Sequence, residues 1–313
     1  MNLRRRCWIS KSTKLLAKYN TRSLRKAIEI KNKKMPQKLY QYRSIDEADG
    51  KKRLDWLINI IETGNMYCSQ ASQLNDPFDM RSILSSKKIT SYKNLLKSPE
   101  EYKWLDAFKL LLKVTLKQNA FQKEELDEFG VQFDAIFMRQ IESIYDEHSE
   151  FLSWFKIVCL TETYDNLPMW WLYADRRKGV CVEFEKQRFS EQVETFTFPV
   201  NYTHKLPDVI KTLDKVEKFQ DKMSETDLYM HTLISTGIYP CLHKLADWEY
   251  EREWRYIMLN QEQVHFGKPS KIILGDMIES ENKEKICIVA MAQGIEVTQI
   301  KITPYGIVEE PIK

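Results

Sequence analysis

The chain is most regular between residues 248 and 258, which read Trp248-Glu249-Tyr250-Glu251-Arg252-Glu253-Trp254-Arg255-Tyr256-Ile257-Met258. Charged and aromatic side chains alternate along this stretch, and a period of two residues is that of a β-strand with one polar and one apolar face. We therefore predict a strand here that carries several charges on one face, namely Glu249, Glu251, Glu253 and Arg255.

Short strand patterns recur on both sides of this stretch. They cover residues 38–43, 66–69, 155–161, 179–184, 253–259, 271–274 and 297–302. Helical patterns lie between them at irregular intervals, and one of them ends at Gly64, a residue that suits a helix C-terminus. Because a regular βαβ alternation and a glycine fingerprint are both absent, the predicted class is α+β with a mostly antiparallel central sheet.

The chain is predicted to form one domain over residues 38–313, preceded by a basic N-terminal arm at 1–37. Apolar residues at helical spacing predict a helical insertion at about 91–150 that packs outside the sheet. A weaker pattern predicts a charged helix at about 206–234. A further short helix is expected to start at Pro168, which suits a first helical turn.

The charge of the chain is distributed unevenly. Residues 1–34 hold twelve Lys or Arg and one acid, Glu29, a net charge of +11; since the whole chain carries +3, residues 35–313 carry −8. Such an arm could contact nucleic acid or an anionic membrane through phosphate groups. It also has the Arg-rich look of an organelle targeting segment, and the simplest alternative is an extension outside the folded domain.

Composition narrows the class of protein. Hydrophobic residues make up 43% and charged residues 30%, which is typical of a globular chain, and no apolar run approaches the length of a membrane helix. The six cysteines show no CxxC pair, so we expect reduced core residues in a cytoplasmic protein rather than a zinc site or a disulfide framework. Walker and Gly-x-Ser-x-Gly motifs are absent as well.

The order of several motifs resembles a family known as domain of unknown function 2971. The resemblance spans about residues 38–290, and it implies no established activity. It rests on five segments: Leu39-Tyr40-Gln41-Tyr42-Arg43-Ser44, Asn75-Asp76-Pro77-Phe78-Asp79, Met169-Trp170 with Tyr173-Ala174 and Lys178-Gly179-Val180, Tyr250-Glu251-Arg252-Glu253-Trp254-Arg255, and Ile272-Ile273-Leu274-Gly275.

A strand-borne Arg, a strand-borne Ser and a late Glu-x-Glu, in this chain order, also look like the constellation of ADP-ribosyltransferases. This resemblance implies that Arg43 holds NAD through a bidentate contact and that Ser69 braces the site. Glu253 would stabilise the oxocarbenium-like charge as nicotinamide leaves, and Glu251 would orient or deprotonate the acceptor. The full set expected to bind NAD is Tyr42, Arg43, Ser69, Asn75, Asp76, Trp170 and Tyr173.

The resulting hypothesis is an NAD-consuming effector enzyme, toxin-like or defence-associated, that modifies an unidentified macromolecule or hydrolyses NAD. It predicts that Arg43, Ser69, Glu251 and Glu253 converge on one cleft. For each group a structural role stands beside the functional one: Arg43 could pair with a carboxylate, the late glutamates could form an exposed strand face, and Trp170 could belong to the core.

Two other classes of function remain open. One is a metal-dependent hydrolase or nuclease that uses carboxylates to bind magnesium. The other is a non-enzymatic binding or sensor module with an aromatic-rich cleft, which the eight Trp and fifteen Tyr would suit. The carboxylates available to the first class are Asp76, Asp79, Glu162, Glu183, Glu251 and Glu253.

Overall fold

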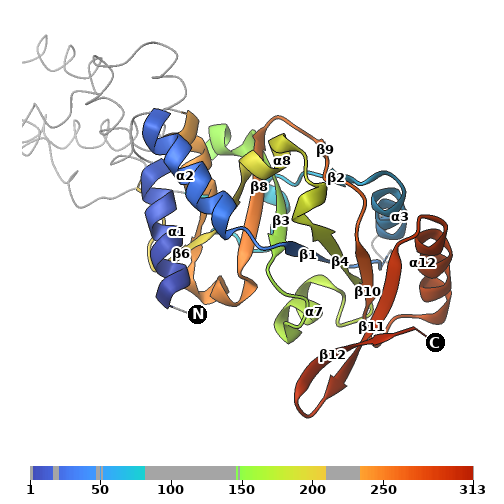
Figure 1. Ribbon diagram of the computed structural model, residues 1–313. Coiled ribbons are helices and arrows are strands. Elements are labelled where there is room, and N and C mark those ends of the chain that lie inside the picture. The colour runs from blue at the N-terminus through green and yellow to red at the C-terminus, as the bar shows by residue number, and fades with distance from the viewer. Residues whose placement is uncertain are drawn as a thin grey trace, which may run out of the picture.

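A sheet of eight strands forms the centre of the molecule (Figure 1). The computed structural model describes residues 3–16, 21–46, 50, 52–81, 146, 149–208 and 233–312. In spatial order the strands are β12 (Gly306–Pro311), β11 (Glu296–Thr303), β10 (Lys271–Leu274), β4 (Val180–Glu185), β1 (Lys38–Arg43), β3 (Phe155–Thr161), β8 (Glu253–Leu259) and β5 (Thr197–Pro199).

The pairing within this sheet is antiparallel at every junction except one. The exception is the parallel pair of β10 and β11, which α12 (Ser280–Ala292) connects. Two further pairs lie outside the sheet: β2 (Asn65–Tyr67) with β9 (Gln263–His265), and β6 (Asn201–Thr203) with β7 (His243–Leu245). The predicted α+β class with a mostly antiparallel sheet is therefore confirmed.

Helices cover both faces of the sheet because the central strands are apolar on both faces. On one face, α3 (Arg53–Thr63) and α12 pack with Leu39, Val182 and Trp254. On the other, α7 (Leu167–Tyr173) packs through Trp170 against Tyr42. The predicted end of α3 is also confirmed, since Gly64 is in the left-handed conformation with φ 73°.

The N-terminal residues differ from the expected arm. They form α1 (Leu3–Leu16) and α2 (Thr21–Lys34), which lie side by side at one end of the molecule (Figure 1). Ile9, Leu16 and Ala27 are buried, and the Trp8 ring lies 5.9 Å from that of Trp254. A few apolar residues at helical spacing are enough to bind these basic helices to the body, so they are part of the fold.

The alternation over residues 248–258 suggested an extended chain throughout, but the chain is extended only in the part that we listed as the strand 253–259. Residues 246–251 form a 3-10 helix, η6 (Ala246–Glu251), and Arg252 then takes a left-handed conformation with φ 48°. Only from Glu253 onward is the chain extended. The remaining short helices are η1 (Ala71–Gln73), η4 (Lys186–Arg188), α8 (Glu191–Phe196), η5 (Leu233–Ile238) and α11 (Tyr239–Cys241).

Two predicted helical regions, 91–150 and 206–234, lie almost entirely outside the described residues. Within the described residues, no helix has the length and apolar character needed to cross a membrane.

Candidate functional site

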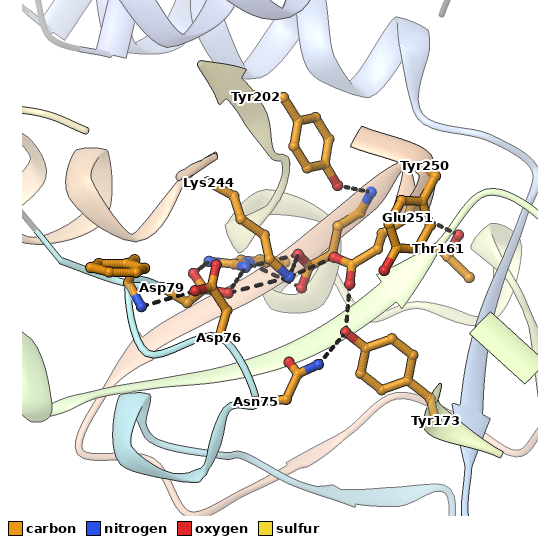
Figure 2. A network of polar contacts seen from close by, with 12 residues as sticks. Asn75, Asp76, Asp79, Thr161, Tyr173, Tyr202, Lys244, Tyr250 and Glu251 are labelled. Carbon is orange, nitrogen blue, oxygen red and sulfur yellow. Dashed lines mark hydrogen bonds and ion pairs between the residues drawn. The ribbon is translucent and has the colours of Figure 1, made fainter. Parts of the chain in front are cut away.

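Arg255 on β8 is the centre of a buried ionic network, and Figure 2 labels Asp79, Lys244 and Glu251 among its members. Its guanidinium donates two hydrogen bonds to the Asp79 carboxylate at 2.7 and 2.6 Å and two to the Glu253 carboxylate at 3.0 and 2.8 Å. A fifth bond reaches the carbonyl oxygen of Cys241 at 2.8 Å. All five N–H donors of the guanidinium are therefore used.

Strand period and a turn together position these groups. Glu253 and Arg255 lie two residues apart on β8, so their side chains project from the same face of the sheet. Asp79 comes from the Asn75–Asp79 turn, where its backbone N–H bonds to the carbonyl of Asp76 at 3.1 Å. Two segments far apart in the sequence thus meet at one bidentate arginine pair.

Lys244 on β7 adds a second buried cation. Its Nζ lies 2.5 Å from a carboxylate oxygen of Glu251, 3.4 Å from Asp79 and 3.6 Å from Glu253. The ammonium also lies 4.8 Å from the centroid of the Trp248 ring. The network therefore contains two cations and three carboxylates, so one negative charge is left unbalanced when every carboxylate is ionised.

Glu251 connects this network to the surface. The hydroxyl of Tyr173, a half-buried residue, donates to Glu251 at 2.5 Å, and the side-chain amide of exposed Asn75 donates to the Tyr173 oxygen at 2.9 Å. The Thr161 hydroxyl holds the Glu251 backbone carbonyl at 2.5 Å. Figure 2 shows the resulting line of contacts from Asn75 through Tyr173 to Glu251.

The two glutamates have opposite pKa shifts. Burial, together with the charge of Glu253, raises the pKa of Glu251 to about 7, although Lys244 and Tyr173 act in the other direction. Burial alone would raise the pKa of Glu253 too, but Arg255 and Lys244 outweigh it and hold that pKa at about 2. Glu251 is therefore the member of the network that exchanges its proton near neutral pH.

A polar groove of about 510 Å³ lies beside the network. We call it the Arg252 groove, and it is lined by Thr163, Asp165, Asn166, Glu249, Tyr250 and Arg252. Its wall includes both sequence neighbours of Glu251, whereas the buried Glu251 itself lies behind the wall, and a volume of a few hundred Å³ suits a small ligand.

Asn166 fixes the shape of the Arg252 groove. Its side chain accepts a hydrogen bond from the Met169 N–H at the start of α7 and donates to the Tyr250 carbonyl at 2.7 Å. It therefore ties the first turn of α7 to the last residues of η6. Pro168 stands in that first turn, as predicted.

The structure gathers part of the predicted site. Asn75, Tyr173, Glu251 and Glu253 all belong to the network. Asp76 lies in the same turn as Asn75; one of its carboxylate oxygens accepts from the Phe78 N–H at 2.9 Å, and the other is buried with no hydrogen-bond partner among the described residues.

Arg43 lies on the other face of the sheet, which corrects the predicted convergence. Tyr40 pairs with Thr161, and Thr161 pairs with Glu253, so these three side chains share a face. Arg43 is three residues from Tyr40 on β1 and projects oppositely. Its guanidinium donates to Gln41 at 2.7 Å, its Nε is buried with no hydrogen-bond partner in the described part of the chain, and burial lowers its pKa to about 10.

Three other predicted residues are also displaced from the network. Ser69 pairs with Ile157, four residues before Thr161, which is about 13 Å along β3. Trp170 is completely buried, donates from its indole nitrogen to the Tyr164 carbonyl at 2.7 Å and meets the edge of Tyr42 at 5.2 Å between ring centroids. It belongs to the core, so neither Trp170 nor Tyr42 is available to stack on a ligand.

Sequence reasoning missed Lys244 as a site residue. A lone lysine in a three-residue strand gives no signal of its own, and its role depends on the pairing of β6 with β7. Tyr202 on β6, whose hydroxyl accepts from the Glu253 N–H at 2.9 Å, was missed for the same reason. Arg255 was recognised on the correct face, but its pairing with Asp79 joins residues 176 positions apart.

The carboxylates considered for a metal site gather only in part, and Asp79, Glu251 and Glu253, which do, are paired with Lys244 and Arg255. Glu183 pairs with Lys38 at 2.9 Å, and Glu162 accepts from the Trp254 indole at 2.9 Å. Asp79 and Glu253 are both paired with Arg255. In the described ranges, no three His, Cys, Asp or Glu side chains are arranged to hold a metal ion.

Comparison with known proteins adds one finding. The family model described as protein of unknown function (DUF2971) matches residues 169–256, which include Tyr173, Lys244, Glu251 and Arg255. No curated protein and no solved structure matches the chain significantly. The resemblance predicted from the sequence is therefore confirmed, and residues 169–256 are similar to the DUF2971 family of proteins of unknown function.

Proposed function

We propose that the chain is an enzyme in which Glu251 performs acid–base chemistry on a small polar substrate held in the Arg252 groove. The observation that carries the proposal is a buried carboxylate with a pKa of about 7, hydrogen-bonded to a tyrosine that leads to the surface. A catalytic base works best when its pKa is near the working pH. Strongly shifted carboxylates beside a groove are a feature of active sites.

The arrangement assigns different tasks to the two glutamates. Glu253 holds Arg255 with both of its oxygens and is fully engaged, so it acts as a fixed negative charge. Glu251 keeps its contact with Tyr173, whose hydroxyl donates to it while accepting a hydrogen bond from the Asn75 side-chain amide. In its ionised form Glu251 would accept a proton from a water or hydroxyl nucleophile, and as an acid it would then give that proton to the leaving group.

The groove offers groups for binding a polar ligand. Arg252 is exposed and projects from a left-handed residue, which sets it apart from the buried neighbours at positions 251 and 253. Tyr250 supplies an aromatic ring, and Asp165 supplies an exposed carboxylate. Such a lining suits a ligand that carries both an anionic group and hydrogen-bond donors.

Cleavage of NAD is the narrower form of this proposal. It rests on the Glu-x-Glu resemblance, with Glu251 in place of Glu253 as the reacting glutamate and with Arg252, not Arg43, as the nearby arginine. The residues expected to bind NAD are not gathered in one place, so the glutamates alone support it. A toxin-like or defence-associated role, and any macromolecular acceptor, belong to this narrower proposal.

Release of nicotinamide from NAD tests both the role of Glu251 in acid–base chemistry and the narrower proposal that NAD is the substrate. The wild-type chain, Glu251→Gln and the distant exposed control Glu310→Gln would be assayed between pH 5.5 and 8.5. We expect a rate that rises with pH up to about 7 and falls on the order of 10²- to 10⁴-fold in Glu251→Gln, the contribution of a general base. Glu310→Gln should retain wild-type activity.

Three outcomes separate the alternatives. Absence of NAD turnover and NAD binding would end the narrower proposal. A Glu251→Gln variant that keeps its activity while folded Glu253→Gln loses it would restore the role that the resemblance gives to Glu253. Magnesium-dependent cleavage of nucleic acid that EDTA abolishes would support the hydrolase alternative instead.

A further inference from the structure

The outer surface of α1 and α2 is strongly basic. We call it the α1–α2 basic face and define it by seven exposed cations: Lys11, Lys14, Arg22, Arg25, Lys26, Lys33 and Lys34. The sequence of the two helices contains a single acid, Glu29, which is also exposed. None of the seven cations has an ion-pair partner among the described residues.

Four cations on α2 lie along one side of the helix, with the exposed Glu29 between Lys26 and Lys33 on the same side. Arg22, Arg25, Lys26 and Lys33 follow one another at spacings of three, one and seven residues, which keeps them on one side of a helix. From Arg22 to Lys33 this row of cations is about 16 Å long at ~1.5 Å per residue. Because the opposite side of α2 packs on the body through Ala27, the row has a fixed orientation toward solvent.

A nucleic-acid duplex is the partner that this surface fits. We propose that the α1–α2 basic face binds the phosphate backbone of a duplex without reading its sequence. A duplex carries one negative charge per ~1.7 Å of axis, so a rigid row of cations on this scale meets several phosphates at once. The net charge of −8 on the rest of the chain has little effect at this distance, because physiological salt screens charges beyond ~8 Å.

The same two helices argue against a membrane as the partner. A helix that lies in a membrane surface inserts an apolar face between lipids. Here the apolar residues Ile9, Leu16 and Ala27 are buried against the body. Leu24 and Ile28 pack against the same core cluster, so no apolar face remains free on the described part of α1 and α2.

Single-stranded nucleic acid also suits the α1–α2 basic face poorly. Proteins that hold single strands usually stack bases on exposed aromatic rings. The two helices contain one aromatic residue, Trp8, and its ring packs against Trp254. The face therefore offers charge without stacking, which is what sequence-independent duplex binding requires.

The test measures binding of the full chain to fluorescein-labelled 20-base-pair duplexes of DNA and of RNA, by anisotropy at several salt concentrations. The variant R25A/K26A/K33A removes three cations of the basic face. The matched control K52A/K268A/K301A removes three exposed lysines that belong to other elements. Both variants change the net charge equally, and circular dichroism would verify that both are folded.

We expect the R25A/K26A/K33A variant to lower the slope of log affinity against log salt by about 2 to 3, at ~0.9 per lost phosphate contact, and to weaken binding at 100 mM salt at least tenfold. The control should bind within about twofold of wild type, and E29K should bind the duplex more tightly. Equal loss in both triple variants would overturn the proposal. So would binding to phosphatidylserine vesicles, or to a single strand, in the absence of duplex binding.

Discussion

Glu251 and Glu253 stand two residues apart and are equally buried, yet their surroundings differ. Glu253 faces a guanidinium that occupies both of its oxygens, whereas Glu251 faces one ammonium and a neutral tyrosine. Glu253, held by Arg255, has a lowered pKa, whereas Glu251, which has the weaker pairing, has a raised one. Placement relative to the cations, not burial, therefore decides which glutamate can exchange a proton.

Removal of Arg255 should cause the largest loss of stability, because it takes away the main partner of Glu253. Arg255→Ala leaves Asp79 and Glu253 buried without their main partner, and breaking a buried ion pair costs about 3–5 kcal/mol. Urea unfolding followed by circular dichroism measures this loss. Arg252→Ala, at an exposed neighbouring position, serves as the control. A similar stability of the two variants would mean that the network contributes little.

The free energy of unfolding should depend on pH through the raised pKa of Glu251. The folded-state pKa of Glu251 is above its ordinary value of 4.5, so the folded protein binds more protons than the unfolded chain, and stability falls as pH rises from about 4.5 through 7. The shift corresponds to about 3 kcal/mol at most. Glu251→Gln should remove this decline in urea unfolding curves measured from pH 5 to pH 8. A decline that is unchanged in this variant would assign it to another group.

Glu253 should affect the stability in a lower pH range than Glu251 does. Its folded-state pKa is below 4.5, so the stability that it contributes is present above pH 4.5 and is lost as pH falls toward about 2. The magnitude is again about 3 kcal/mol at most. Glu253→Gln should flatten the acid limb of the stability profile and leave the neutral limb intact. If the two glutamine variants altered the same limb, the assignment of opposite shifts would fail.

The smallest effect is expected at Tyr173. Tyr173→Phe removes a hydrogen bond that favours ionised Glu251, so the pKa of Glu251 should rise further and stability at pH 8 should fall by about 1 kcal/mol. Tyr67→Phe, at an exposed position, is the matched control. An unchanged Glu251 pKa in Tyr173→Phe would show that the tyrosine does not support the carboxylate.

The strand framework could be predicted from the sequence because period-two patterns are local. Phe155–Thr161, Lys271–Leu274 and Glu253–Leu259 were predicted with the bounds that the structure has. The short helix before Glu253 was missed, because its residues continue the same alternation of aromatic and charged side chains as the strand that follows.

The site was harder to predict because it depends on sheet register. The face on which Arg43 projects follows from the pairs Tyr40 with Thr161 and Thr161 with Glu253, and no single segment reveals those pairs. The pairing with a carboxylate that we considered for Arg43 is made by another arginine, Arg255, which bonds to Asp79 and Glu253. The kind of residue that pairs with the carboxylates was thus easier to predict than its position in the sequence.

Titration of the carboxyl carbons by NMR, on protein carrying ¹³C-labelled glutamate, tests the central claim most directly. The Glu251 resonance would be assigned by its loss in the Glu251→Gln spectrum. The account predicts a midpoint near pH 7 for this carboxyl, with the Glu253 carboxyl still ionised at pH 4. A Glu251 midpoint near 4.5 would contradict it, because that carboxyl would then be an ordinary ionised partner of Lys244.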